Sequence, residues 1–174
     1  MKMFGGPCIF LDRNDINTDE IIPAKYLTEN SKIALKPYIL EDLQLDGFDP
    51  ASQVLSNAQV IVTRQNFGCG SSREHAVWVF EVNDINVVIA SSFARIFRQN
   101  MFNCGMLAIE LPSEEIDAIF ALGTDAVVQV DLEHNLISAE NEQGNSLSIT
   151  FSMNEFDRDL VMVGGWLAYA DKKY

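Results

Sequence analysis

The chain has 174 residues, of which 48% are hydrophobic and 10% aromatic, a composition that suits one domain with a sizeable core and argues against disorder. Its formal net charge of −13 and its lack of a Lys and Arg cluster argue against a nucleic-acid partner. Residues 1–7 contain no long apolar segment and no apolar run is long enough to span a bilayer, so we expect a cytoplasmic protein with no membrane partner.

The cysteines are three in number and far apart in the sequence, at Cys8, Cys69 and Cys104. Neither a disulfide framework nor a CxxC metal site has this pattern. We therefore expect reduced thiols, and no metal or cofactor held by this chain alone.

The first third of the chain begins with a short apolar strand at 8–11, followed by a polar run at 12–19 that is rich in turn formers. Asp19 precedes an apolar helical start, so it either caps a helical turn or points its carboxylate into a site; capping is the favoured interpretation. Between 26 and 50 the periodicity is broken, which indicates a functional loop or an ordinary surface excursion.

A regular pattern begins at residue 58. A strand at 58–63, a helix at 72–82 and a strand at 85–90 form a predicted βαβ unit with parallel strands. Ser92 is expected to cap a second helix that ends near 103–105, before another strand at 106–111.

The last third has a different pattern. A short helix opens at Ser113, and segments 127–132 and 147–151 then flank polar turns, which indicates antiparallel hairpins. A final helix is predicted at 154–163, after which two glycines release the tail 166–174. The order of elements predicts an α/β fold with a mixed sheet covered by helices.

The densest chemistry lies at the strand-to-helix junction, residues 66–76, with the sequence NFGCGSSREHA. Gly68 and Gly70 permit positive φ and let a ligand approach backbone N–H groups. A helix start favours a carboxylate or phosphate, and Arg73 can bind a carboxylate through two parallel hydrogen bonds. The spacing matches neither a dinucleotide fingerprint, a P-loop nor a serine-hydrolase elbow, which leaves carboxylate binding.

Two interpretations of Ser71 remain open from the residues alone. Ser71 and Glu74 spell a Ser-x-x-Glu capping box, which explains both by backbone hydrogen bonding. Ser71 beside Arg73 could instead be an activated alkoxide, although no base is visible nearby in the sequence.

The remaining cysteine and histidine side chains considered as reactive groups are interpreted as structural or solvated residues. Cys69 is interpreted as a small buried thiol rather than a nucleophile. His75 is interpreted as a hydrogen-bonded supporting or core residue, and His134 as a solvated turn residue. Two distant histidines do not favour a zinc hydrolase.

The segments 17–24, 66–76 and 91–97 together resemble the small subunits of 3-isopropylmalate dehydratases and the swivelling domain of aconitases. The resemblance covers essentially the whole chain. It implies a single swivelling β/β/α domain over 1–174, with a mixed, barrel-like sheet flanked by helices. It also implies a large-subunit partner, in a heterodimer or heterotetramer, that carries a 4Fe–4S cluster.

The same resemblance implies roles for individual residues. Ser71 would be the alkoxide base, Arg73 would bind a substrate carboxylate and stabilise that alkoxide, and Asp19 would meet a histidine of the large subunit. Ser72 and Gly70 would contribute to carboxylate binding. The implied activity is that of a hydro-lyase of leucine biosynthesis, active only with its large subunit, that interconverts 2-isopropylmalate and 3-isopropylmalate.

In the resembled family, the loop after residue 27 meets the variable group of the substrate. Members that act on an isopropyl group have apolar residues there, and members that act on tricarboxylates have an arginine. Thr28 and Glu29 match neither pattern. Glu29, facing inward, would repel a third carboxylate. Isopropylmalate is therefore favoured, with dimethylmalate, citramalate, homoaconitate or citrate as alternative substrates. A non-catalytic carboxylate-binding module and a merely capped helix start are the alternatives to an enzyme subunit.

Overall fold

The computed structural model describes residues 3–174; residues 1 and 2, part of the N-terminal stretch considered above, lie outside the described residues. The strands are β1 (Phe4–Phe10), β2 (Val60–Val62), β3 (Val87–Ala90), β4 (Leu107–Glu110), β5 (Val127–Asp131), β6 (Leu136–Glu140) and β7 (Ser146–Thr150). The α-helices are α1 (Thr18–Ile21), α2 (Gln53–Asn57), α3 (His75–Val82), α4 (Arg95–Asn103), α5 (Ser113–Phe120), α6 (Glu155–Val163) and α7 (Trp166–Lys173), with 3-10 helices η1 (Ala24–Tyr26) and η2 (Lys32–Tyr38). Within the described residues, no helix is both long and apolar enough to cross a membrane.

The strands form one seven-stranded sheet in the order β4-β3-β2-β1-β5-β6-β7. β1, β2, β3 and β4 pair in parallel, with Val60 opposite both Cys8 and Val87, which confirms the predicted βαβ unit. β2 and the neighbouring β3 consist entirely of buried aliphatic residues, as expected for parallel strands covered on both faces.

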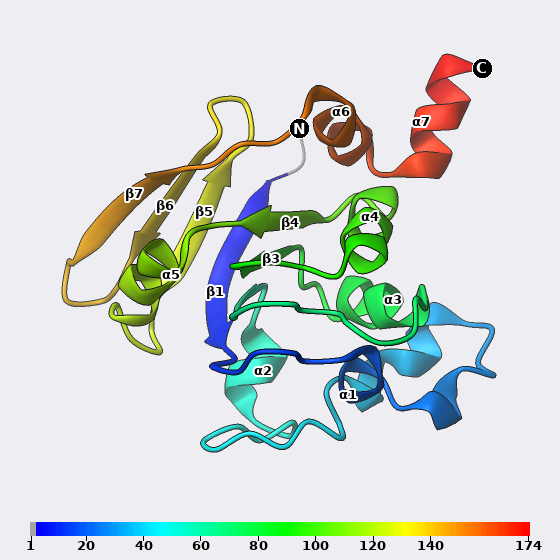
Figure 1. Ribbon diagram of the computed structural model, residues 1–174, viewed down its shortest axis with the longest axis horizontal. Helices are drawn as coiled ribbons and strands as arrows, with labels where there is room; N and C mark the ends of the chain where they lie inside the picture. Colours follow the sequence, from blue (N-terminus) through cyan, green and yellow to red (C-terminus); the bar gives the residue numbers. More distant parts are fainter. Residues whose placement is uncertain (1–2) are drawn as a thin grey trace.

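The other end of the sheet is an antiparallel meander, as the hairpin pattern predicted. β1 pairs with β5 in antiparallel fashion, and β5, β6 and β7 follow one another. Figure 1 shows these three strands tilted against β3 and β4, so that the mixed sheet curls, with helices around it. The predicted α/β fold with a barrel-like mixed sheet is confirmed.

The C-terminal tail differs from its prediction, because residues after the two glycines form the helix α7 rather than a released tail. Gly164 and Gly165 have φ of 97° and 113° and turn the chain against the end of α4. A Cβ on Gly165 would lie 2.4 Å from the carbonyl oxygen of Asn103, so this close packing requires glycine. The helix that follows stacks Trp166 on Tyr169, with ring centroids 5.8 Å apart.

Two further elements depart from the pattern. Ser92 does not cap α4, because the cap position is Ala94 and the Ser92 Oγ instead accepts a hydrogen bond from the backbone N–H of Asn66 at 2.8 Å. Between 26 and 50, the 3-10 helix η2 contains residues 33–35, where the broken pattern indicates a helical fragment, whereas α2 before β2 was not predicted. Short helices leave too few turns for a periodic signal, so tertiary packing decides them.

Candidate active site

The junction 66–76 lies at the carboxyl edge of the parallel strands, where the segments that follow β1, β2 and β3 meet. The backbone N–H of Gly68 donates to the carbonyl of Ile16 at 2.8 Å, and that of Thr18 donates to the carbonyl of Cys69 at 2.9 Å. Phe67 forms an isolated parallel bridge with Phe93. Three loops are thus joined by backbone hydrogen bonds at the edge where open α/β sheets bind ligands.

Both glycines of the junction adopt positive φ, as predicted: 82° at Gly68 and 98° at Gly70. A Cβ on Gly68 would lie 2.2 Å from Cγ of Phe97, whereas one on Gly70 would meet nothing closer than 3.4 Å. Gly68 therefore packs on the core, whereas a Cβ on Gly70 would make ordinary contacts with Asn17 and Thr18.

An aromatic layer supports the junction from below. The ring of Phe67, 1% exposed, lies 5.5 Å from that of Phe97 and 6.1 Å from that of Phe80. Phe93 contributes a further edge contact to Phe67 at 6.3 Å. This layer fixes the backbone that presents the polar side chains.

The predicted capping box of Ser71 and Glu74 is wrong. Helix α3 begins at His75, its cap residue is Glu74 in the right-handed helical region, and no side chain caps it. The backbone of Ser71 lies before the helix, with its carbonyl accepting from the N–H of Arg73 at 3.0 Å. The Ser71 hydroxyl is therefore not used as a cap, and it accepts a hydrogen bond from Nη2 of Arg73 at 3.4 Å.

The capping interpretation of Asp19 is also wrong. Asn17 caps α1 in a reciprocal capping box with Glu20. The sequence contains the corresponding Asn-x-x-Glu pattern, which should have been preferred to an Asp19 cap. Asp19 is free to accept a hydrogen bond from Nη1 of Arg73 at 2.6 Å. Its side chain is 62% exposed and that of Arg73 is 23% exposed, so the ion pair lies at the rim of the junction.

The Asp19 helix is itself anchored by an ion pair below it. Burial raises the pKa of Glu20, but hydrogen bonds from Arg13 and from the backbone of Asn17, with the charge of Arg13, outweigh burial and lower that pKa overall. The guanidinium of Arg13 donates to the Glu20 carboxylate. Glu20 thus holds α1 against the β1 loop while Asp19 points outward.

The other predicted substrate residues lie around this pair. Ser72 is exposed beside Ser71, and Thr28 and Glu29 are exposed on the turn after η1. The carbonyl oxygen of Glu29 lies 3.3 Å from Nε2 of His75, the first residue of α3. The structure therefore places this loop close to the junction.

The thiols do not form a reactive or metal-binding group. Cys69 is half-buried rather than buried, and desolvation, followed by the charge of Asp15, raises its pKa, so a helix start does not activate it. Burial raises the pKa of Cys8 to about 12 and that of Cys104 to about 11. They come from β1 and from the end of α4, in separate elements.

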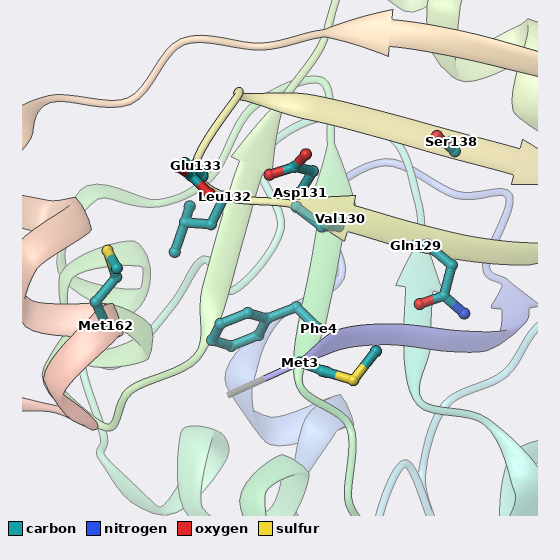
Figure 2. A pocket seen from close by; sticks show the side chains of 9 residues that line it. All are labelled: Met3, Phe4, Gln129, Val130, Asp131, Leu132, Glu133, Ser138 and Met162. Atoms are coloured by element: carbon teal, nitrogen blue, oxygen red, sulfur yellow. The ribbon is translucent and has the colours of Figure 1, made fainter. Parts of the chain in front are cut away.

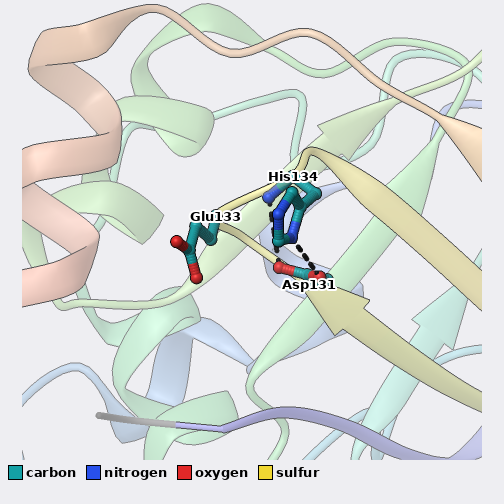
Figure 3. A group of neighbouring side chains, drawn as sticks. All are labelled: Asp131, Glu133 and His134. Atoms are coloured by element: carbon teal, nitrogen blue, oxygen red, sulfur yellow. Dashed lines mark hydrogen bonds and ion pairs between the residues drawn. The ribbon is translucent and has the colours of Figure 1, made fainter.

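Two other groups of side chains lie outside the junction, near the antiparallel strands. A cavity of about 430 Å³ lies beside the start of β1, with Phe4, Leu132 and Met162 around it (Figure 2). Asp131, Glu133 and His134 gather at the turn between β5 and β6 (Figure 3) and are the one group of metal-ligand type in the described part of the chain. His134 is 69% exposed, as predicted, and its ring bonds Asp131 at 2.7 Å.

The fold and the junction together define a class of protein: an α/β domain with a curled mixed sheet that presents a serine, an arginine and an aspartate together at the carboxyl edge of its parallel strands. Residues 8–114 match the family described as the aconitase C-terminal domain.

Named relatives specify the family further. The 3-isopropylmalate dehydratase small subunit of Buchnera aphidicola subsp. Schizaphis graminum is 38% identical over 173 residues, covering 92% of this chain and 81% of the relative. Small subunit 2 of Deinococcus radiodurans is 40% identical over 157 residues, covering 90% and 71%. The solved structure of the Methanocaldococcus jannaschii 3-isopropylmalate dehydratase has a TM-score of 0.78 and 30% identity, covering 99% of this chain and 95% of that one. The chain belongs to the family of 3-isopropylmalate dehydratase small subunits, within the aconitase superfamily.

Proposed function

We propose that this chain is the small subunit of a 3-isopropylmalate dehydratase, a hydro-lyase that interconverts 2-isopropylmalate and 3-isopropylmalate. The observation that carries the proposal is the contact of one guanidinium, that of Arg73, with both Ser71 and Asp19. The names of the relatives favour isopropylmalate over the alternative substrates and over a non-catalytic module. The whole chain, 1–174, acts as one swivelling domain, which its single buried cluster supports.

The junction supplies carboxylate recognition and proton transfer. Arg73 has a planar fork of donors that suits a substrate carboxylate, and Ser72 and the backbone at Gly70 lie next to it. The Ser71 oxygen, stabilised as an alkoxide by Arg73, takes a proton from the carbon beside the hydroxyl-bearing carbon. The carbon–oxygen bond breaks with its electrons on oxygen, so the hydroxyl leaves as hydroxide, and this hydroxide and the proton on Ser71 together make up the water eliminated. Rehydration adds hydroxide to the carbon that lost the proton and transfers the Ser71 proton to the carbon that lost the hydroxyl, which restores the alkoxide.

The partner in this proposal is a large subunit that holds a 4Fe–4S cluster. Cys8, Cys69 and Cys104 do not fit such a cluster, because they lie in separate elements and each has a raised pKa, whereas cluster ligands are thiolates. The Asp131 group contains no thiol. The cluster of the large subunit supplies Lewis acidity, and this chain supplies the groups described above.

Asp19 gives a reason why the chain acts only with its partner. In the chain alone its carboxylate occupies the guanidinium that we assign to the substrate. A histidine from the large subunit would take Asp19 as its own partner and leave Arg73 free for the substrate. Thr28 and Glu29 then lie on the side of the variable substrate group, as proposed substrate-binding residues.

The test is reconstitution with the genomically adjacent large subunit under anaerobic conditions, followed by an assay of 2-isopropylmaleate hydration. Ser71→Ala removes the proton acceptor and should lower kcat by about 10²- to 10⁴-fold. Ser138→Ala on β6 is the matched control and should retain wild-type activity. Full activity of Ser71→Ala, or no activity of the wild-type complex on any substituted malate, would refute the proposal.

A further inference from the structure

We propose that His75 is a positioning residue that holds the loop 27–30 beside the catalytic groups and thereby sets which substituted malates the site accepts. The inference rests on the proposed function and extends it. It concerns a histidine that lies close to Ser71 and Arg73 in the sequence and has no part in the reaction described above.

The loop depends on this contact because it has little else to hold it. The rings of Tyr26 and Tyr38 stack 3.9 Å apart and close the base of the excursion. Beyond that base, the N–H of Glu29 bonds back to the Tyr26 carbonyl at 3.1 Å, a bond within the turn. Among the described residues, the bond to the Glu29 carbonyl from His75, at 3.3 Å, is the one that ties 27–30 to another part of the chain.

The next part of the excursion, η2, is also held against α3. The ammonium of Lys32 pairs with Glu81 at 3.1 Å and lies 5.5 Å from the ring centroid of Trp78. Near the end of the helix, Nδ2 of Asn83 donates to the carbonyl of Lys36 at 3.2 Å. Several side chains of α3 therefore contact the segment 27–38, and His75 is the one that contacts the loop 27–30.

The orientation of the imidazole is set from its own helix. The ring of His75 packs against that of Trp78, three residues along α3, with centroids 4.6 Å apart and an interplanar angle of 46°. A carbonyl oxygen only accepts hydrogen bonds, so Nε2 of His75 must carry the proton. The geometry therefore assigns the Nε2–H form to His75.

The connection to the catalytic groups is short. His75 is two residues from Arg73, so their Cα atoms are at most about 7 Å apart. A hydrogen bond from this position fixes the distance between the carboxylate-binding guanidinium and Thr28. Because the guanidinium fixes one end of the substrate, that distance limits the size of the variable group at the other end.

The consequence is a selective effect on substrate binding. A neutral hydrogen bond contributes up to about tenfold in an equilibrium, so His75→Ala should raise KM for isopropylmalate by about three- to tenfold with little change in kcat. The preference for the isopropyl over the methyl-substituted malate should fall by the same factor. His75→Gln keeps a donor and should recover part of the preference.

The experiment uses the reconstituted complex with both substrates and compares His75→Ala with Asn83→Ala. The control removes a bond to the carbonyl of Lys36 at the far end of the same helix, together with a bond to the carbonyl of Val79 within it. Amide hydrogen exchange of the isolated chain supplies a readout that needs no activity. His75→Ala should speed exchange at 27–30 and leave α3 protected, while Asn83→Ala should leave 27–30 unchanged. The ring ¹⁵N spectrum should show Nε2–H for His75.

The outcomes separate this inference from the function it rests on. An active wild-type complex with unchanged KM, preference and loop exchange in His75→Ala would overturn the positioning role alone, as would an Nδ1–H imidazole. A loss of kcat alone in His75→Ala would likewise overturn it. An inactive wild-type complex overturns the proposed function, while the exchange data still test the tie between His75 and the loop.

Discussion

Each half of the sheet has one end that carries a pair of an aspartate and a basic side chain, and the two pairs differ in how their members are brought together. In the parallel half, three loops meet at one edge and place Asp19 and Arg73 in contact although they are 54 residues apart in the sequence. In the antiparallel half, Asp131 and His134 also pair, but they are neighbours in one hairpin turn. A site needs elements that converge, and parallel strands supply this because their carboxyl ends share an edge.

The comparison is tested most strongly by Arg73→Lys. Lysine keeps the charge and loses the planar fork, so the substrate carboxylate and Ser71 lose their shared donor. We expect kcat/KM of the reconstituted complex to fall by about 10- to 100-fold, from the worth of hydrogen bonds to charged groups. The assay is 2-isopropylmaleate hydration at several substrate concentrations.

The matched change in the meander is Asp131→Asn, which removes the charge of the corresponding ion pair. It should leave kcat/KM unchanged. Equal losses in Arg73→Lys and Asp131→Asn would show that the two halves are not functionally distinct.

Glycine substitution extends the comparison to stability. In Gly68→Ala the new Cβ meets Phe97 at a φ of 82°, so strain and overpacking should lower the free energy of unfolding by about 2–5 kcal/mol. In Gly144→Ala, at the β6–β7 turn, φ is 88° and nothing lies within 4 Å, so only the strain of about 1–2 kcal/mol is expected. Urea unfolding of both variants measures the difference, and equal values would contradict the close packing of Gly68 on the aromatic layer.

Acid pH should weaken the parallel half through Glu20. Its pKa is lowered in the fold from the usual 4.5, so its stabilisation is complete above that value and is lost as pH falls through the folded pKa. The stability difference between wild type and Glu20→Gln should therefore be complete above about pH 4.5 and shrink as pH falls through the lowered folded pKa. A difference that is constant with pH would mean that the Arg13 pair does not couple to folding.

The smallest expected effect on stability comes from the His134–Asp131 pair of the meander, and its pH dependence is opposite in sign to that of Glu20. The hydrogen bond that the imidazole of His134 donates to the Asp131 carboxylate, together with the charge of that carboxylate, raises the pKa of His134. This stabilisation is therefore present below the usual 6.5 and is lost as pH rises through the folded pKa. His134→Ala should be slightly less stable than wild type at acid pH and equal to it at alkaline pH. Thermal unfolding across that range is the measurement, and a larger effect at alkaline pH would contradict it.

Sequence reasoning succeeded where local pattern and global fold agree. The buried runs at 60–62 and 87–90 and the glycine-rich turn predicted the βαβ unit and the positive φ values at Gly68 and Gly70. It failed at helix starts. The side chains of Asp19 and Ser92 are of capping type but bond to distant segments, and that of Ser71 bonds to the side chain of Arg73 instead of to a backbone N–H. The contact of Arg73 with Asp19 depends on loop convergence, which no local window contains, and it was not predicted, because the resemblance pairs Asp19 with a histidine of the large subunit.

The aromatic layer beneath the junction bears on how tightly two subunits can associate. Phe67 and Phe97 pack together beneath the backbone of the junction in the chain alone, without a partner. A surface that is already ordered loses little conformational entropy on docking, so the association constant reflects contacts at the interface rather than the folding of a loop. Substitutions that loosen the packing of this layer should therefore slow or weaken assembly of the complex, even when Ser71, Arg73 and Asp19 are unchanged.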